Sequence, residues 1–245
     1  SLCRWFNSSP GHHHMKKFKI FTLILLLFGS SCEYDSNDFF PSIVGLKWVY
    51  SIVIKSSYTG KSDNKRIMIT NHSKEKKGKI TELSKLYSDG SLYSYEIEKN
   101  RITRSSVILA FSDGIDEPIK KIIYPDTTFK QKEWTVREQL FLVRGFQPPL
   151  RNAKPRSQFD MKYKISNRYK NYEVKNFIYN DCIEIEGSGT TNFIGDTRSG
   201  PIEVKINNVE ILCDGVGLVK QIRSEKTDAS AFGNMTLSKS LLSFE

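Results

Sequence analysis

Histidine is scarce in this chain of 245 residues: there are four, and three of them form the run His12–His14. His72 is the only other histidine, which argues against sites built on two or more histidines. The motifs of P-loop nucleotide sites, zinc metalloproteases, Cys-x-x-Cys redox sites and Gly-x-Ser-x-Gly hydrolases are also missing. Gly187-Ser188-Gly189 is interpreted as a turn and not as a nucleophile. We therefore predict no catalytic residue, no metal site and no cofactor, in a protein that is not an enzyme.

Long hydrophobic runs are lacking too. Residues 20–28 form the one uncharged apolar run near the amino end, and a cationic stretch, Met15–Lys19, precedes it. A transmembrane helix needs about 20 apolar residues, so this run is too short to span. The pattern is typical of a signal peptide, predicted here over residues 15–31. Residues 1–14 precede the cationic start and are interpreted as an expression tag or a gene start placed too far upstream.

The three residues before Cys32 are small, in the order Gly-Ser-Ser. They resemble the end of a bacterial lipoprotein signal, after which the cysteine is acylated and becomes the first mature residue. Gly29 departs from the aliphatic residue usual there, and an ordinary secretory signal with a free Cys32 is the alternative. The resemblance implies a lipid anchor on Cys32, a tether over residues 32–38 and a bilayer-bound protein that does not span. In such lipoproteins an aspartate directly after the cysteine retains the protein at the inner membrane. Glu33 stands at this place, which implies an outer-membrane anchor facing the periplasm.

From Phe39 onward, apolar and polar residues alternate, and β-branched and aromatic residues are frequent. We predict a mainly β domain over residues 39–245, with at most one or two short helices. Two segments are ambiguous between helix and strand: Glu133–Val143 and Ala229–Leu242. Trp48 and Tyr50 are expected as buried anchors. Strands are predicted at Leu46–Lys55, Arg66–Thr70, Lys79–Tyr87, Leu92–Glu98, Ile102–Phe111, Lys120–Tyr124, Glu133–Arg144, Met161–Ser166 and Tyr172–Tyr179, with a turn at Ser73–Gly78.

Two alternating segments near the carboxyl end, Asp181–Glu186 and Ile202–Ile206, flank turn residues 195–200. In a hairpin centred between residues 197 and 198, opposed positions sum to 395, and so do Cys182 and Cys213. Opposed Cβ atoms lie about 4.5–5.5 Å apart, close to what a disulfide needs. In an exported chain these would be the only thiols after Cys32, so we predict a bridge between them. Two separate buried thiols are the alternative, since one bulge would break this register.

Residues Gly145–Ser157 contain three prolines and predict a surface loop or subdomain boundary. This segment is interpreted either as a solvated loop or as a docking loop for anionic headgroups or a partner. The basic residues in and beside it are Arg144, Arg151, Lys154 and Arg156.

Two motifs resemble those of bacterial envelope lipoproteins. Phe39–Tyr50 has the opening aromatic-Pro-x-x-x-Gly-x-x-Trp-x-Tyr, and Asn180–Ile185 with Gly215–Lys220 (Gly-Val-Gly-Leu-Val-Lys) resembles the strand pair near the carboxyl end of that family. The resemblance implies a single strongly curved antiparallel sheet, similar to the half-barrels of lipoprotein-carrier and related envelope proteins, whose activity is mostly unassigned.

Three functions remain open at this point. The first is a structural or interaction lipoprotein that binds envelope proteins or lipid. The second is a carrier or chaperone for a hydrophobic ligand, which needs an open apolar cavity that Trp48, Tyr50 and Trp134 could fill. The third is an uncharacterised hydrolase. Nucleic acid is not expected as a partner, despite the formal net charge of +10 and the basic, tyrosine-rich stretch Tyr163–Tyr172, because an exported protein meets lipid and envelope proteins first.

Overall fold

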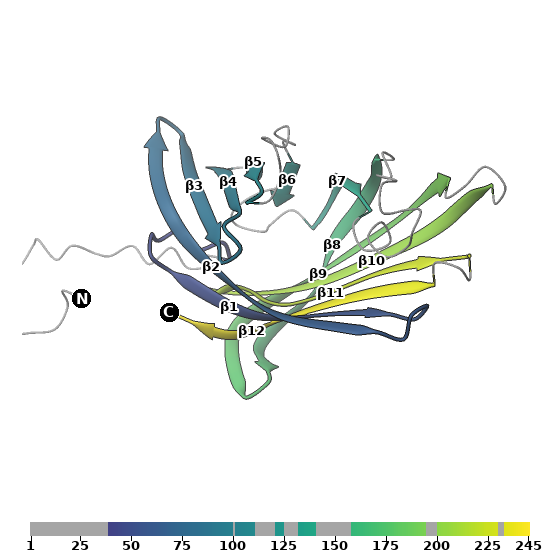
Figure 1. Ribbon diagram of the computed structural model, residues 1–245. Coiled ribbons are helices and arrows are strands. Elements are labelled where there is room, and N and C mark those ends of the chain that lie inside the picture. Colours follow the sequence, from purple (N-terminus) through teal and green to yellow (C-terminus); the bar gives the residue numbers. More distant parts are fainter. Residues whose placement is uncertain are drawn as a thin grey trace, which may run out of the picture. The chain divides into compact units, whose positions relative to one another are not determined.

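A computed structural model describes residues 39–99, 101–110, 121–124, 132–140, 158–194, 200–229 and 233–245. These residues lie in one compact unit and form twelve strands (Figure 1). No helix occurs in these ranges, and accordingly none has the length and apolar character to cross a membrane. The strands are β1 (Lys47–Ser56), β2 (Ser62–Lys77), β3 (Ile80–Tyr87), β4 (Leu92–Glu98), β5 (Arg101–Ile108), β6 (Lys121–Tyr124), β7 (Glu133–Gln139), β8 (Gln158–Val174), β9 (Phe177–Ile194), β10 (Pro201–Cys213), β11 (Gly217–Thr227) and β12 (Asn234–Phe244).

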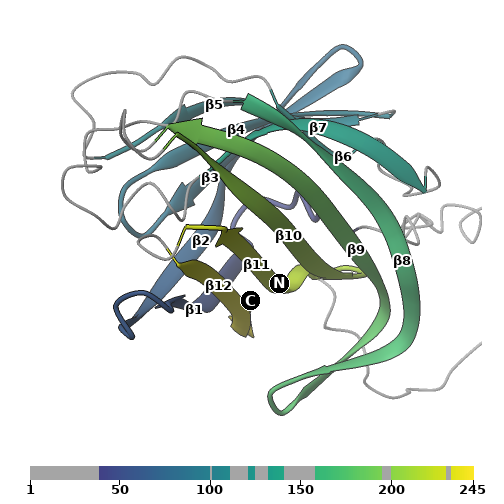
Figure 2. The same ribbon diagram turned by 90° about the vertical axis from the view of Figure 1, so that its right-hand side faces the viewer.

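The strands form one antiparallel sheet in the order β6-β5-β4-β3-β2-β1-β12-β11-β10-β9-β8-β7. Each half of the chain makes a meander of six strands, and the pairing of β1 with β12 joins the two meanders. Figure 2 shows how strongly the sheet curves, and the edge strands β6 and β7 contact each other. The predicted fold class is therefore confirmed: the sheet is curved, nearly closed and barrel-shaped.

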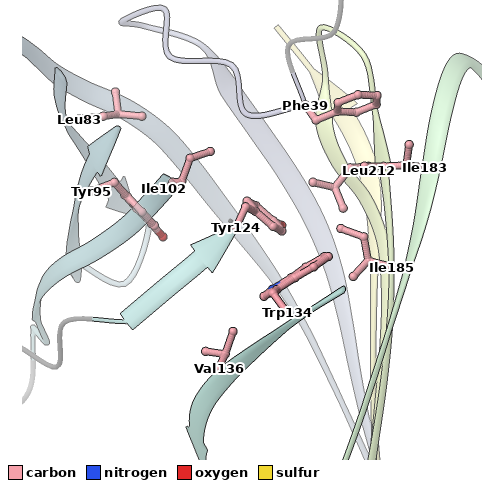
Figure 3. Close-up of a cluster of buried hydrophobic side chains, with 10 residues drawn as sticks. All are labelled: Phe39, Leu83, Tyr95, Ile102, Tyr124, Trp134, Val136, Ile183, Ile185 and Leu212. Carbon is pink, nitrogen blue, oxygen red and sulfur yellow. The ribbon is translucent and has the colours of Figure 1, made fainter. Parts of the chain in front are cut away.

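The two halves pack face to face across the inside of this sheet. Figure 3 shows Leu83, Tyr95 and Ile102 on one side and Ile183, Ile185 and Leu212 on the other, with the rings of Tyr124 and Trp134 between them. All of these side chains are buried. Burial of apolar area at about 25 cal/mol per Å² is the main term that holds the meanders together.

The opening and closing motifs of the sequence contact each other directly. Trp48 donates from Nε1 to the carbonyl oxygen of Val216 over 2.7 Å. The hydroxyl of Tyr50 donates to the carbonyl oxygen of Leu218 over 2.8 Å. Gly217 has φ +81°, and a Cβ there would lie 3.2 Å from Cδ of Pro41. Only glycine fits this position without strain, because the conformation is left-handed and the neighbouring chain lies close.

The predicted β9–β10 register is found over the whole ladder, from Pro201 opposite Ile194 to Cys213 opposite Cys182. These two cysteines form a disulfide, as predicted. They are buried with Trp48, Tyr50 and Leu241 in one apolar cluster. The bridge therefore belongs to the same cluster as residues of the first and last strands of the chain, β1 and β12.

Several predicted boundaries are wrong. Residues predicted as a turn at Ser73–Gly78 belong to β2 as far as Lys77. The end of β2 is exposed, so its sequence needs no alternation of apolar residues to form a strand. The predicted strand Tyr172–Tyr179 spans the turn between β8 and β9, where Lys175 adopts φ +57°.

Two further segments proved to be strand. Gly187-Ser188-Gly189 lies within β9 and not in a turn, and most of the ambiguous segment Ala229–Leu242 belongs to β12. A Cβ on Gly187 would lie 2.5 Å from the ring of Tyr163. The glycine is therefore explained by the close approach of that ring to the strand backbone.

Removing the disulfide should destabilise the fold. The bridge joins residues 31 positions apart, and for a loop of about 30 residues the chain-entropy estimate is about 3 kcal/mol. We expect the variant Cys182→Ala/Cys213→Ala to lose about 2–4 kcal/mol in the free energy of unfolding, measured by urea titration. An unchanged unfolding midpoint with an unchanged slope would contradict the structural role of the bridge.

Candidate functional site

A cluster of paired charges lies inside the sheet, defined here as the interior charge cluster: Lys121, Glu138, Arg223 and Glu225. Arg223 contacts Glu225 from Nη2 over 3.0 Å and from Nε over 3.1 Å, and its Nη1 lies 3.9 Å from Oε2 of Glu138. Glu138 also accepts a hydrogen bond from Lys121. Arg223 is 3% and Glu225 0% exposed, so the pairing offsets a large desolvation cost.

The cluster connects strands that are distant in the sheet order. Lys121 is on β6 and Glu138 on β7, the two edge strands, whereas Arg223 and Glu225 are on β11. Arg223 also donates to the backbone carbonyl of Gln139 over 3.2 Å. Ionic contacts thus link the two edges of the sheet at the point where it nearly closes.

A second polar group surrounds Glu210 on β10. Its carboxylate accepts hydrogen bonds from Tyr124 over 3.2 Å, from Asn208 over 2.9 Å and from Gln221 over 3.0 Å. Burial raises the pKa of the Tyr124 hydroxyl well above its usual value, and the nearby Glu210 carboxylate adds to this. Tyr124 therefore stays protonated and donates to Glu210 at any physiological pH.

Lys239 on β12 is a further cation inside the sheet. Its ammonium lies 4.2 Å from the centroid of the Tyr50 ring, and among the described residues no carboxylate lies within 4.0 Å of it. Burial lowers its pKa from 10.5 to about 8, while the negative charge of Glu210 acts in the opposite direction. A cation held mainly by an aromatic ring is only partly compensated for the water it has lost.

Two buried donors inside the described part of the chain have no hydrogen-bond partner there: Nε1 of Trp134 and Nε of Arg104. Trp134 stacks on Tyr163 at a centroid distance of 5.7 Å. Arg104 lies near enough to Lys121 to lower the pKa of that lysine, although burial is the larger cause. The interior near β5 and β7 therefore holds two donors without an acceptor in the described part of the chain.

On the outer face, a groove of about 800 Å³ runs over β7 to β10. Its lining combines polar side chains such as Thr135, Lys162, Lys164 and Glu186 with apolar surface from Trp134 and Val209. Lys164 and Glu186 form an ion pair of 3.2 Å between exposed side chains. Exposed pairs of this kind contribute little free energy. Asn208, a buried polar residue of the lining, already donates to Glu210 and accepts from Gln221.

The sequence analysis missed the interior charges, although a signal for them exists. Strand β11 carries Val219, Gln221, Arg223 and Glu225 at alternate positions, and the first of these is buried apolar core. A charged residue at a position that shares the alternation of core residues is expected to point inward. The partner of such a charge comes from another strand and cannot be found by spacing.

The predicted site residues divide into two groups. Cys182 and Cys213 are brought together as a disulfide. Cys32 and the predicted docking loop with Arg144, Arg151, Lys154 and Arg156 lie outside the described residues.

Comparison with known proteins gives distant likenesses only. No family model and no curated protein matches the chain. Among solved structures, a candidate exported protein with a YmcC-like fold from Bacteroides fragilis matches with a TM-score of 0.47 and 10% identity, covering 85% of this chain and 99% of that one. A candidate lipoprotein from Parabacteroides distasonis matches with a TM-score of 0.46 and 12% identity over the same shares.

Breaking the interior charge cluster should cost far more than breaking a surface pair. Arg223→Met removes the cation that lies 3.0 Å from the buried Glu225 and leaves Lys121 as the cation beside Glu138, and we expect a loss of about 3–5 kcal/mol in the free energy of unfolding. The control is Arg137→Ala, which removes an exposed 2.9 Å pair with Asp160 and should cost at most about 1 kcal/mol. Equal losses in the two variants, measured by urea titration, would contradict the assigned burial.

Lys239 should make the protein more stable as pH rises above 8. Because its folded pKa, about 8, lies below its ordinary 10.5, the unfolded chain binds more protons between these values, and stability increases with pH there. We expect the stability of the wild type relative to Lys239→Met to rise from pH 8 to 10.5, measured by urea titration at each pH. Groups other than Lys239 titrate in both proteins, so their contribution cancels when the two free energies of unfolding are subtracted. If this difference does not change with pH, Lys239 is not buried as a cation.

Proposed function

We propose that this protein is a lipoprotein of a bacterial cell envelope, held on the periplasm-facing side of the outer membrane by acyl chains on Cys32. Its β domain acts as an interaction module and not as an enzyme. The anchor rests on the sequence of residues 15–32, with its cationic start, its short apolar run and its small residues before the cysteine.

The single observation that carries the proposal is the buried disulfide between Cys182 and Cys213. Structural disulfides persist in oxidising compartments and are rare in a reducing cytosol. A bridge in the core of the domain, together with a signal sequence ahead of it, supports export before folding is complete.

The pairing of the interior charges supports a role other than catalysis. Glu138, Glu210 and Glu225 each accept from a cation or from neutral donors, and Arg223 is shared between two carboxylates. A general acid or base needs a group free to exchange a proton with a substrate. These carboxylates instead hold β6, β7, β10 and β11 against one another.

A carrier for an acidic amphiphile is the second candidate. The partnerless donors of Trp134 and Arg104 favour it, because they would suit an anionic headgroup inside the sheet. The burial of Trp48, Tyr50 and Trp134 argues against it, since these rings occupy space that an acyl chain would need. We therefore place the interaction module first.

Mass spectrometry of the mature protein, extracted from membranes without reduction, tests the proposal. We expect Cys32 as the first residue with its acyl chains, and a mass lower by two hydrogen atoms for the Cys182–Cys213 bridge. Cys32→Ala should leave the precursor uncleaved and without acyl chains, because the modified thiol is gone.

The matched control is Cys182→Ala/Cys213→Ala, which should keep the acylated amino terminus. An intact leader on a protein from the cytosolic fraction would overturn the proposal. A lipid that co-purifies in equal molar amount would favour the carrier over the interaction module.

A further inference from the structure

Strands β8 and β9 continue past the end of the sheet as a two-stranded arm. β10 pairs with β9 only from Cys182 onward, whereas β8 and β9 stay paired with each other down to Val174 opposite Phe177. Figure 2 shows this hairpin extending beyond the adjoining ends of β10 and β11. We call residues 172–179 the β8–β9 tip.

The β8–β9 tip exposes two large apolar side chains. Phe177 is 54% exposed and Ile178 is 68% exposed, the highest value among the large hydrophobic residues described. They directly follow a turn at Lys175 and Asn176, a place where small polar residues are usual. Exposed apolar residues at the end of a projecting arm indicate a surface that another apolar phase covers.

Behind these two residues, tyrosine rings and lysines lie as at a membrane interface, while the exposed Glu173 is opposed to Ile178 on the neighbouring strand. Tyr172 is opposed to Tyr179 on the next pair of the ladder, and the ammonium of Lys220 lies 6.0 Å from the Tyr172 ring. Lys175 at the turn is exposed. Tyrosine rings prefer the headgroup level of a bilayer, and lysines extend from there to water.

The β8–β9 tip lies at the end of the sheet where the chain arrives from Cys32. The first residue of β9, the last of β10 and the first of β1 are all at this end, and the amide of Asp214 donates to the carbonyl of Asp181 over 3.1 Å. Only six residues separate Cys32 from Phe39, and fully extended they reach about 25 Å. Ile43, 66% exposed, precedes β1 at the same end.

We propose that the β8–β9 tip inserts Phe177 and Ile178 into the bilayer that holds the acyl chains of Cys32. The inference rests on the proposed lipid anchor and adds a second contact to it. An acyl anchor alone leaves the domain free to rotate about its tether, whereas two contacts fix which face of the sheet points away from the membrane. The partner is therefore lipid, and a protein that covers the tip is an outcome of the test.

The test places a fluorescent label at the tip of the acylated protein. In the mature lipoprotein Cys32 is acylated and Cys182 is bridged to Cys213, so Asn176→Cys adds a single free thiol beside the intact Phe177 and Ile178. The protein is reconstituted into vesicles of phosphatidylethanolamine and phosphatidylglycerol with brominated acyl chains. We expect the label at residue 176 to lose most of its emission by bromine quenching.

Two controls accompany this measurement. A label on Tyr58→Cys, in the exposed turn after β1 at the other end of that strand, should keep its emission. Adding Ile178→Glu to the labelled protein should restore emission at residue 176, because it replaces an apolar side chain by a second carboxylate opposite Glu173, and this pair resists entry into hydrocarbon. The matched charge Ile222→Glu, on the outward face of β11, should leave the quenching unchanged.

The outcomes separate this inference from the proposed function. Acyl chains on Cys32 with an unquenched label at residue 176 overturn the inserted tip and leave the lipid anchor standing. If the emission of the label at residue 176 changes only when a second protein is added, and bromine does not quench it, insertion is also overturned in favour of a protein partner. Absence of acyl chains on Cys32 overturns the anchor and, with it, this inference.

Discussion

The register in which β9 pairs with β10 is the constraint on which the rest of the sheet depends. Side chains alternate with a period of two, so the pairing that opposes Cys182 to Cys213 also sends Ile183, Ile185 and Leu212 to the inside. A slip of one residue would turn these side chains to water and separate the thiols. The disulfide thus fixes a register that the inward apolar residues also require.

The pairing of β1 with β12 is the second constraint, because it joins the two meanders into one sheet. Trp48 and Tyr50 on β1 bond to carbonyls 168 residues later in the chain, and Gly217 makes room for Pro41. Such distant contacts cost more chain entropy to form than neighbouring hairpins do. The opening and closing motifs are therefore one structural unit, although they are far apart in sequence.

The interior charges serve the same closure. β6 and β7 contact each other at the edges of the sheet, and Lys121 and Glu138 provide an ionic contact between them. Glu138 is held in turn by Arg223, which also binds Glu225. Buried pairs rarely add net stability compared with apolar residues, but they are directional, and here they specify which strands meet across the interior.

The sequence alone determined the strand class, the β9–β10 register, the disulfide and the burial of Trp48 and Tyr50, because alternation and turn residues act between neighbours in the chain. It also indicates the acyl anchor at Cys32, which remains a proposal. Only the tertiary structure decided where Arg223 and Glu225 find Glu138, how far β8 and β9 project, and that Gly187 lies under a tyrosine ring. These features depend on how strands far apart in sequence curve toward one another, and no local spacing records that curvature.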